Sequence, residues 1–163
     1  DQLGVDVEEA SDILMRFNTY APFVRQMADT VMRSATTRGY IKTLLGRRCH
    51  FDMWEPRQYG TGRPMKHKEA MHEYNGDIKR AFVYKALNKL IQGSAADMTK
   101  KAMLDCYNAS YRPLLQVHDE LVFSVSDKKE VEGIVKTMEK AVLLEVPNKV
   151  DAEIGENWGD SMS

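Results

Sequence analysis

The sequence has only two cysteines, Cys49 and Cys106, and they lie far apart along the chain. Two isolated thiols cannot build a four-ligand zinc site or the disulfide framework of a small secreted domain, so we expect both to be reduced. No apolar run approaches the ~18 residues that cross a bilayer, and the first residues lack the pattern of a signal peptide. These absences predict a cytoplasmic protein that contacts no membrane.

An initiator methionine is also absent, because the chain starts at Asp1. The 163 residues are therefore either a processed protein or a segment of a longer one, and we favour the segment. A chain of this length forms one typical domain and can bury roughly two thirds of its unfolded surface. Internal repeats and low-complexity tracts are both missing, so we treat residues 1–163 as a single segment.

Charge is balanced overall but unevenly distributed. The chain has 23 basic and 24 acidic residues. Residues 47–118 carry 13 basic and 7 acidic side chains, whereas residues 119–163 carry 5 basic and 11 acidic ones. A basic centre favours a phosphate-bearing partner, although an ordinary solvated surface explains the same pattern.

Hydrophobic periodicity predicts helices and strands in roughly equal number. The predicted helices span residues 6–21, 22–39, 78–109 and 127–146, and the predicted strands pair as hairpins over 40–51 and 113–125, with a last strand at 150–154. Asp6 and Asp127, each followed three residues later by Glu, are typical N-caps, and Gly39 is a typical helix stop. We therefore expect an α+β fold in which helices pack on a small antiparallel sheet, with Trp158 packed back on it.

The first hairpin presents two adjacent cations, Arg47 and Arg48, beside the turn residue Gly46. This is a modest signal for phosphate contact. After the hairpin, residues 54–76 combine Gly and Pro with basic side chains and show no steady periodicity, which predicts a basic loop with a short helix at 68–74. His67 and His72 are five residues apart, which does not suit a metal pair on a helix, so we expect them at the surface.

The long predicted helix carries two rows of side chains. Its buried side is expected to consist of Leu87, Ile91, Ala95, Met98 and Ala102. A second row recurs every four residues and is polar or small: Tyr84, Asn88, Gln92 and Ala96. Side-chain amides both donate and accept hydrogen bonds, which suits contact with nucleic-acid base edges, but a solvated polar face fits equally well.

The second hairpin has an unusual bend. Two apolar runs flank His118, Asp119 and Glu120, without the Gly or Asn that normally shapes such a turn. Mg²⁺ is generally held by one or two carboxylates together with substrate phosphates, so the bend is a candidate metal site. An ionised carboxylate buried among strands this apolar would need a cation. Neighbouring strand residues point to opposite faces, so Asp119 and Glu120 should not serve equally.

Other chemistries fit the bend less well. A metal phosphohydrolase needs further His and Asp ligands, and His50, His67 and His72 offer no convincing set. A Ser-His-Asp triad lacks a nucleophile on a recognisable elbow. A purely structural turn remains open on spacing alone.

The motif QVHDELV at residues 116–122 resembles the C-terminal active-site motif of family A DNA polymerases, the bacterial DNA polymerase I class. Three further segments resemble that family in the right order: residues 90–97 its helix beside the primer-template, residues 39–48 its Gly-Tyr and Gly-Arg-Arg hairpin, and residues 155–158 its carboxyl end. The resemblance covers nearly the whole chain. The long basic insertion at 54–76 resembles phage members more than the bacterial enzymes.

The resemblance implies roles for the residues of the bend. Asp119 would be a ligand of a two-Mg²⁺ centre that is completed by an aspartate upstream of this chain, and Glu120 would be a supporting carboxylate. His118 would lie against the primer terminus. Gln92 and Asn88 would donate to minor-groove acceptors, whose positions are nearly the same in every Watson-Crick pair.

The remaining DNA contacts are less specific. Arg47 and Arg48 would lie near the nucleic-acid backbone. Tyr84 departs from the family, which often carries a basic residue or His one turn before Asn88, but a tyrosine can still stack or hydrogen-bond. The chain would thus be a fingers and palm portion holding half an active site.

The resemblance therefore implies template-directed DNA synthesis from deoxynucleoside triphosphates in a bacterial or phage-infected cell. The segment alone would be inactive, because the other catalytic aspartate and the fingers helix that grips the triphosphate lie upstream in the family. The alternative is a noncatalytic module that keeps the polymerase scaffold and only binds DNA or a partner protein.

Overall fold

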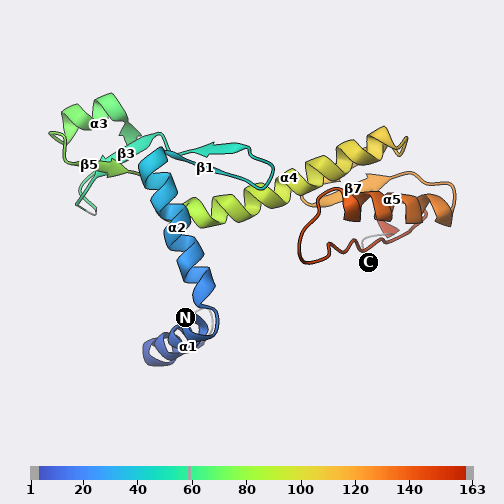
Figure 1. Ribbon diagram of the computed structural model, residues 1–163, viewed down its shortest axis with the longest axis horizontal. Helices are drawn as coiled ribbons and strands as arrows, with labels where there is room; N and C mark the ends of the chain where they lie inside the picture. The colour runs from blue at the N-terminus through green and yellow to red at the C-terminus, as the bar shows by residue number, and fades with distance from the viewer. Residues whose placement is uncertain (1–3, 59, 161–163) are drawn as a thin grey trace. The chain divides into compact units, whose positions relative to one another are not determined.

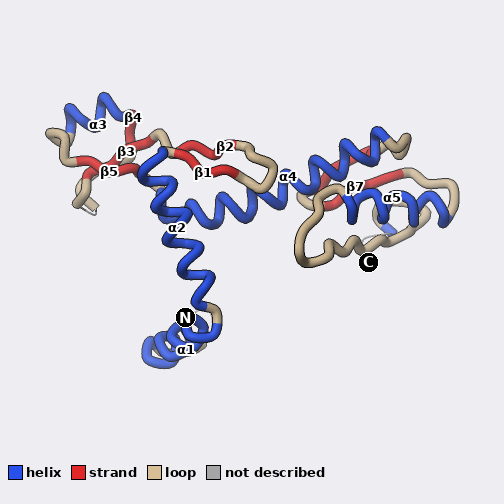
Figure 2. The backbone as a smooth tube through the Cα atoms, viewed as in Figure 1, coloured by secondary structure: helices blue, strands red, loops and turns tan. Residues whose placement is uncertain are grey.

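The computed structural model describes residues 4–58 and 60–160 of the chain. Helices and strands are mixed along the sequence, and the strands in the described part form three small antiparallel sheets (Figures 1 and 2). This confirms an α+β fold, although the strands do not join into one sheet. By their internal contacts the residues divide into two compact units, one ending at Ile91 and the other beginning at Gln92.

The first unit opens with two helices whose ends follow the predicted caps. Helix α1 spans Val7–Tyr20, and the Asp6 carboxylate accepts a hydrogen bond of 2.8 Å from the Glu9 amide. Helix α2 spans Pro22–Arg38 and ends at Gly39, whose φ of 78° is the left-handed conformation that favours glycine. Helix α1 packs against α2, and none of its residues, all of them described, is buried.

The first predicted hairpin is also confirmed. Strands β1 (Tyr40–Lys42) and β2 (Arg48–His50) pair antiparallel, and the Thr43 amide donates to the Arg47 carbonyl at 2.9 Å to close the turn. The core of the first unit lies between this hairpin, helix α2 and the start of a long helix, α4 (Ala86–Asn108). Its buried members are Ala35, Ile41, Phe51 and Ala86.

The expected basic loop is largely ordered and forms a small α/β layer that we call the insert (residues 53–80). Strands β3 (Met53–Pro56), β4 (Met65–Lys66) and β5 (Ile78–Arg80) pair antiparallel in the order β4-β3-β5, and helix α3 spans His67–Glu73. The prediction of a loop was wrong because strands this short show no periodicity. The short helix was predicted to within a residue.

The long helix begins later than predicted. Residues 78–80 have a helical pattern but form β5, because Lys79 and Arg80 pair with Glu55 and Trp54 of β3. Phe82 then adopts a left-handed φ of 61°, which interrupts any continuous helix, and a 3₁₀ turn, η1 (Val83–Lys85), leads into α4 (Ala86–Asn108). Tertiary pairing thus overrides local propensity at this end.

Arg80 holds the insert to the rest of the first unit. Its Nε donates to the Thr36 carbonyl at 3.1 Å and its Nη1 to the Phe51 carbonyl at 2.9 Å, while the guanidinium lies 4.5 Å from the Trp54 ring centroid. Gly39 makes room for it, because a Cβ at this position would lie 2.8 Å from Arg80 Cζ. One side chain therefore links α2, the end of β2 and the sheet of the insert.

We expect Gly39→Ala to destabilise the protein more than an equivalent substitution elsewhere. Placing alanine at a left-handed φ costs roughly 1–2 kcal/mol, and displacing Arg80 would weaken hydrogen bonds worth ~1 kcal/mol each. Gly60→Ala is the matched control, because Gly60 has the same φ of 78° but a Cβ there would meet no described atom within 4 Å. Urea unfolding measures both losses, and equal losses would contradict the proposed role of Arg80.

In the second unit, the later part of α4 is followed by β6 (Pro113–Val117), β7 (Glu120–Phe123) and α5 (Lys128–Lys140). The Asp127 carboxylate accepts from the Glu130 amide at 2.9 Å, and Glu130 Oε2 accepts from the Ser126 amide at 2.8 Å. This reciprocal arrangement confirms the predicted helix start.

The C-terminal predictions were less accurate. Helix α5 ends at Lys140 rather than near residue 146, and no strand follows β7 in the described chain up to Asp160. The apolar pattern at 150–154 forms no strand. Trp158, which was expected to pack on the sheet, is 45% exposed.

The two cysteines differ in environment. Cys49 is half-buried in β2, and Cys106 of α4 is fully buried. Burial raises the pKa of the Cys106 thiol, and the charge of the neighbouring Asp105 raises it further. No helix within residues 4–58 and 60–160 is both long and apolar enough to cross a membrane.

Candidate active site

The bend between β6 and β7 is a two-residue turn formed by His118 and Asp119. The register pairs Val117 with Glu120, so Glu120 is the first residue of β7 and not part of the turn. His118 has a φ of 53°, in the left-handed region that such a hairpin position normally reserves for glycine. The Gln116 side chain donates to the His118 carbonyl at 3.0 Å and closes the bend.

A histidine at this φ costs the fold roughly 1–2 kcal/mol relative to a residue without a Cβ. Residues in sparsely populated backbone conformations cluster at functional sites, where the function of the side chain favours keeping it despite the energetic cost of the conformation. The sequence motif identified the bend but did not predict the left-handed backbone conformation of His118. Three other described residues, Asn75, Phe82 and Ser110, also have a positive φ, so the conformation alone assigns no role to the His118 side chain.

The three polar residues of the bend, His118, Asp119 and Glu120, are all exposed. The strands beside them are more open than their apolar sequence suggests, since Leu114 is 67% and Leu115 is 43% exposed. Neither carboxylate is therefore buried among the apolar strands. In this structure both carboxylates are accessible to solvent, a metal ion or substrate.

The bend fits part of a magnesium site but not a complete one. Within the described residues, no group of three or more His, Cys, Asp or Glu side chains is placed to hold a metal ion. Asp119 and Glu120 offer two carboxylates from adjacent positions. Mg²⁺ usually takes one or two protein carboxylates and completes its shell with water and phosphate oxygens, so this donor set suits a shared centre.

The two side-chain amides of the predicted polar row are accessible on α4. Asn88 and Gln92 lie one turn apart on this helix, and both are exposed. Tyr84 falls outside α4, in η1, so it does not continue the helical row as the sequence predicted. Its ring is 69% exposed and lies 5.6 Å from the Lys85 ammonium, which also lies 5.2 Å from the Phe82 ring.

The two arginines of the first hairpin are exposed, as predicted. The Arg48 guanidinium lies 4.7 Å from the Tyr40 ring centroid, and the Tyr40 ring lies 5.7 Å from that of His50. This stacking orients Arg48 while leaving it accessible. The Arg47 carbonyl accepts a hydrogen bond from the Thr43 hydroxyl, so the backbone of Arg47 also stabilises the turn.

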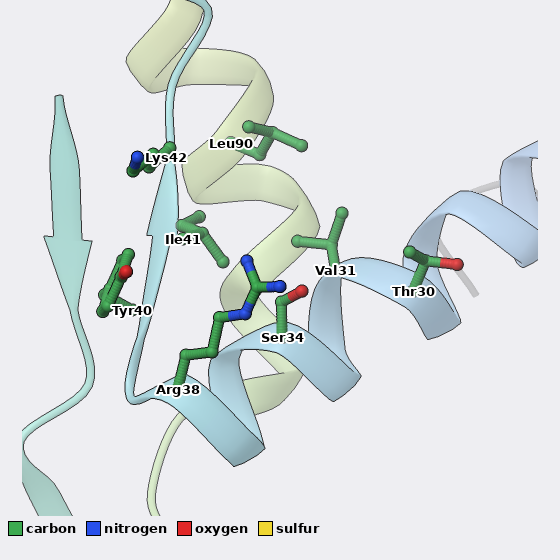
Figure 3. A pocket seen from close by; sticks show the side chains of 8 residues that line it. All are labelled: Thr30, Val31, Ser34, Arg38, Tyr40, Ile41, Lys42 and Leu90. Carbon is green, nitrogen blue, oxygen red and sulfur yellow. The ribbon is translucent and has the colours of Figure 1, made fainter. Parts of the chain in front are cut away.

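A small cleft of about 150 Å³ in the first unit had no counterpart among the sequence predictions. Figure 3 shows the Arg38 guanidinium reaching toward Ser34 and Val31, with Lys42 on the neighbouring strand. The lining residues are Thr30, Val31, Ser34, Arg38, Tyr40, Ile41, Lys42 and Leu90. This volume is well below the 300–1,000 Å³ of ordinary ligand pockets, so the cleft can admit only a small group.

Comparison with known proteins gives consistent matches. The family model for DNA polymerase family A matches residues 1–160. A DNA-directed DNA polymerase of Pseudomonas phage M6 is 39% identical over 154 residues, which is 94% of this chain and 20% of the relative. DNA polymerase I of Geobacillus stearothermophilus is 34% identical over 170 residues, which is 98% of this chain and 17% of the relative.

A solved structure agrees with the sequence matches. The POL domain of Pol1 from M. smegmatis, in complex with DNA primer-template and dNTP, has a TM-score of 0.73 and 30% sequence identity. The match covers 99% of this chain and 27% of that structure. The chain spans about a fifth of the length of the curated relatives that it matches. Because the family model matches almost every residue, the chain belongs to DNA polymerase family A.

Proposed function

We propose that this chain is the C-terminal fingers and palm portion of a DNA-directed DNA polymerase. The complete enzyme would extend a primer by template-directed transfer of deoxynucleotides. The observation that carries the proposal is the β6–β7 bend, where the exposed His118 and Asp119 form a two-residue turn and the exposed Glu120 begins β7. A bend that served only to reverse the chain would gain stability from glycine at position 118.

Asp119 would be the principal metal ligand, and Glu120 would support it from the first position of β7. Family A DNA polymerases are generally metal-dependent. Bound Mg²⁺ would supply Lewis-acid stabilisation of the charge that develops on the phosphate oxygens during transfer. The two carboxylates would hold and orient that centre, and a further aspartate from an upstream polymerase segment would complete it.

His118 would contact the primer terminus from the bend, with its ring presented by the left-handed backbone. Asn88 and Gln92 would donate their amide hydrogens to minor-groove acceptors of the primer-template. Those acceptors, N3 of purines and O2 of pyrimidines, occupy nearly the same positions in every Watson-Crick pair. The amides would therefore test the shape of a pair without reading its sequence.

Tyr84, Arg47 and Arg48 would contribute contacts to the DNA backbone. The exposed Tyr84 ring can stack on a sugar or base or donate its hydroxyl, and the two arginines can each pair with a phosphate. Primer-template DNA and deoxynucleoside triphosphates are proposed as partners because the similar Pol1 domain was solved with both. The bacterial and phage relatives support action in the cytoplasm of a bacterium or of a phage-infected cell.

Primer extension tests the proposal. The purified chain should show no synthesis alone, because the bend supplies only part of the metal centre. Addition of the separately purified upstream segment should give extension that requires Mg²⁺ and all four deoxynucleoside triphosphates. Robust synthesis by these 163 residues alone would refute the division of the active site. DNA binding without extension by the joined protein would favour the noncatalytic module instead.

A further inference from the structure

The cations of the insert fall into two groups. Three of its six Lys and Arg side chains are engaged within the protein. Arg57 Nε lies 3.2 Å from Asp77 Oδ1, and Lys79 Nζ lies 3.7 Å from Glu55 Oε1. Arg80 is held by two carbonyls and the Trp54 ring. These cations serve the structure of the insert and its attachment.

The other three cations, Arg63, Lys66 and Lys68, form what we call the free basic segment. All three are exposed, and within the described part of the chain none makes an ion pair or a cation-π contact through its side chain. They occupy neighbouring positions in the fold. Arg63 lies near the end of the loop after β3, Lys66 ends β4, and Lys68 lies in the first turn of α3.

The two glutamates of α3 lie on a different side of that helix from Lys68. Ala70 is fully buried and marks the inward side. At 100° per residue, Lys68 and His72 fall on the opposite side, one above the other. Glu69 and Glu73 form a separate ridge along one flank. The side of α3 opposite Ala70 therefore carries Lys68 and His72, and neither glutamate lies on it.

The free basic segment is held on a fixed scaffold. The Tyr74 hydroxyl accepts from the Arg63 amide at 3.1 Å and donates to the Arg63 carbonyl at 3.0 Å. The His67 and Trp54 rings meet edge to face at 4.7 Å, which fastens the start of α3 to β3. Figure 1 shows α3 lying along the sheet of β3 and β5. Because the backbone beneath these cations is already ordered, binding a partner would cost only the conformational entropy of their side chains.

We infer that Arg63, Lys66 and Lys68 bind the phosphate backbone of duplex DNA outside the active site. The inference rests on the proposed function, because DNA is the polyanion that a polymerase engages. A protein partner fits less well, since protein interfaces need apolar or aromatic anchors and Met71, 44% exposed, is the one large apolar side chain exposed among the described residues of α3. The contacts would be independent of sequence and would retain the polymerase on its template.

The test uses the complete polymerase carrying Arg63→Gln, Lys66→Gln and Lys68→Gln together. Affinity for a primer-template with a long duplex is measured by fluorescence anisotropy at several salt concentrations. Each lost phosphate contact should reduce the slope of log K against log salt by about 1, so we expect a reduction of up to about 3. Nucleotides added per binding event, measured with a heparin trap, should fall as well. The rate of single-nucleotide incorporation at saturating DNA should not change.

The matched control removes the same charge elsewhere. Lys128, Lys129 and Lys136 are exposed on α5, outside the insert, and their triple Gln variant should keep the wild-type salt slope. A second variant, Lys66→Arg with Lys68→Arg, keeps the charge and should keep the affinity. An unchanged slope in the insert variant, or an equal change in the α5 variant, would overturn the inference.

Failure of this inference can be distinguished from failure of the proposed function. If the wild-type protein synthesises DNA and the insert variant binds it normally, only the role of the free basic segment is wrong. If the wild-type protein does not extend primers in any condition, the proposed function itself fails. Thermal melting of each variant checks that these exposed substitutions leave the fold intact.

Discussion

Asp119→Asn in the complete polymerase is expected to lower the rate of nucleotide transfer by about 10³-fold, which corresponds to ~4 kcal/mol of transition-state stabilisation. The substitution keeps the size and shape of the side chain but removes the charge that would hold a divalent ion. Asp119 is exposed at the turn, so the hairpin should survive the change. Rapid-quench primer extension at saturating DNA and nucleotide measures the transfer step directly.

Two further variants make this prediction specific. Glu120→Gln should lower the rate less, by about 10-fold, because Glu120 starts β7 and would support the centre without being its principal ligand. Asp151→Asn removes an equal charge from an exposed position beyond α5 and should leave the rate unchanged. Full activity of Asp119→Asn, or a larger loss from Glu120→Gln, would contradict the assignment.

Gln92→Leu is expected to lower kcat/KM for a correctly paired primer terminus by 10- to 100-fold, a loss of about 1–3 kcal/mol. Leucine has a similar size and a higher helix propensity, so α4 should remain intact. The lost amide donor would leave a minor-groove acceptor unpaired. If that contact senses the shape of the pair, as proposed, extension from a mispaired terminus should fall much less than extension from a paired one.

The comparison of paired and mispaired primers distinguishes this contact from general weakening of DNA binding. Asn88→Leu, one turn away on the same helix, should show the same bias with a smaller effect. Gln26→Leu on α2, also exposed, is the matched control and should change neither value. An equal loss for both primers would mean that Gln92 supports the helix or the DNA backbone instead of testing base pairs.

Features encoded by neighbouring residues could be predicted from the sequence. The Asp6 and Asp127 caps, the Gly39 stop and both hairpins depend on local backbone chemistry, and the structure has each of them where it was expected. The candidate metal site was proposed on the same kind of local signal, because its polar residues interrupt two apolar runs within a single short motif.

The rest depends on contacts between residues that are distant in sequence. The sequence of strand β5 has a helical pattern, and only its pairing with β3 makes it a strand. Because the helix then begins later, Tyr84 lies in the 3₁₀ turn η1 and not on α4 with Asn88 and Gln92. The Arg80 contacts and the left-handed His118 likewise have no local signal. The exposure of the bend could not be predicted, because apolar residues in strands do not specify what covers them.

The central claim is that the β6–β7 bend carries this chain's share of a catalytic metal centre. Cleavage by hydroxyl radicals tests it directly, with Fe²⁺ replacing Mg²⁺ in the complete polymerase bound to primer-template and nucleotide. Such radicals cut the polypeptide close to the metal. We predict cleavage within a few residues of Asp119 in the wild-type protein and its loss in Asp119→Asn. A wild-type pattern that spares residues 116–122, or cleavage there that persists in the variant, would contradict the account.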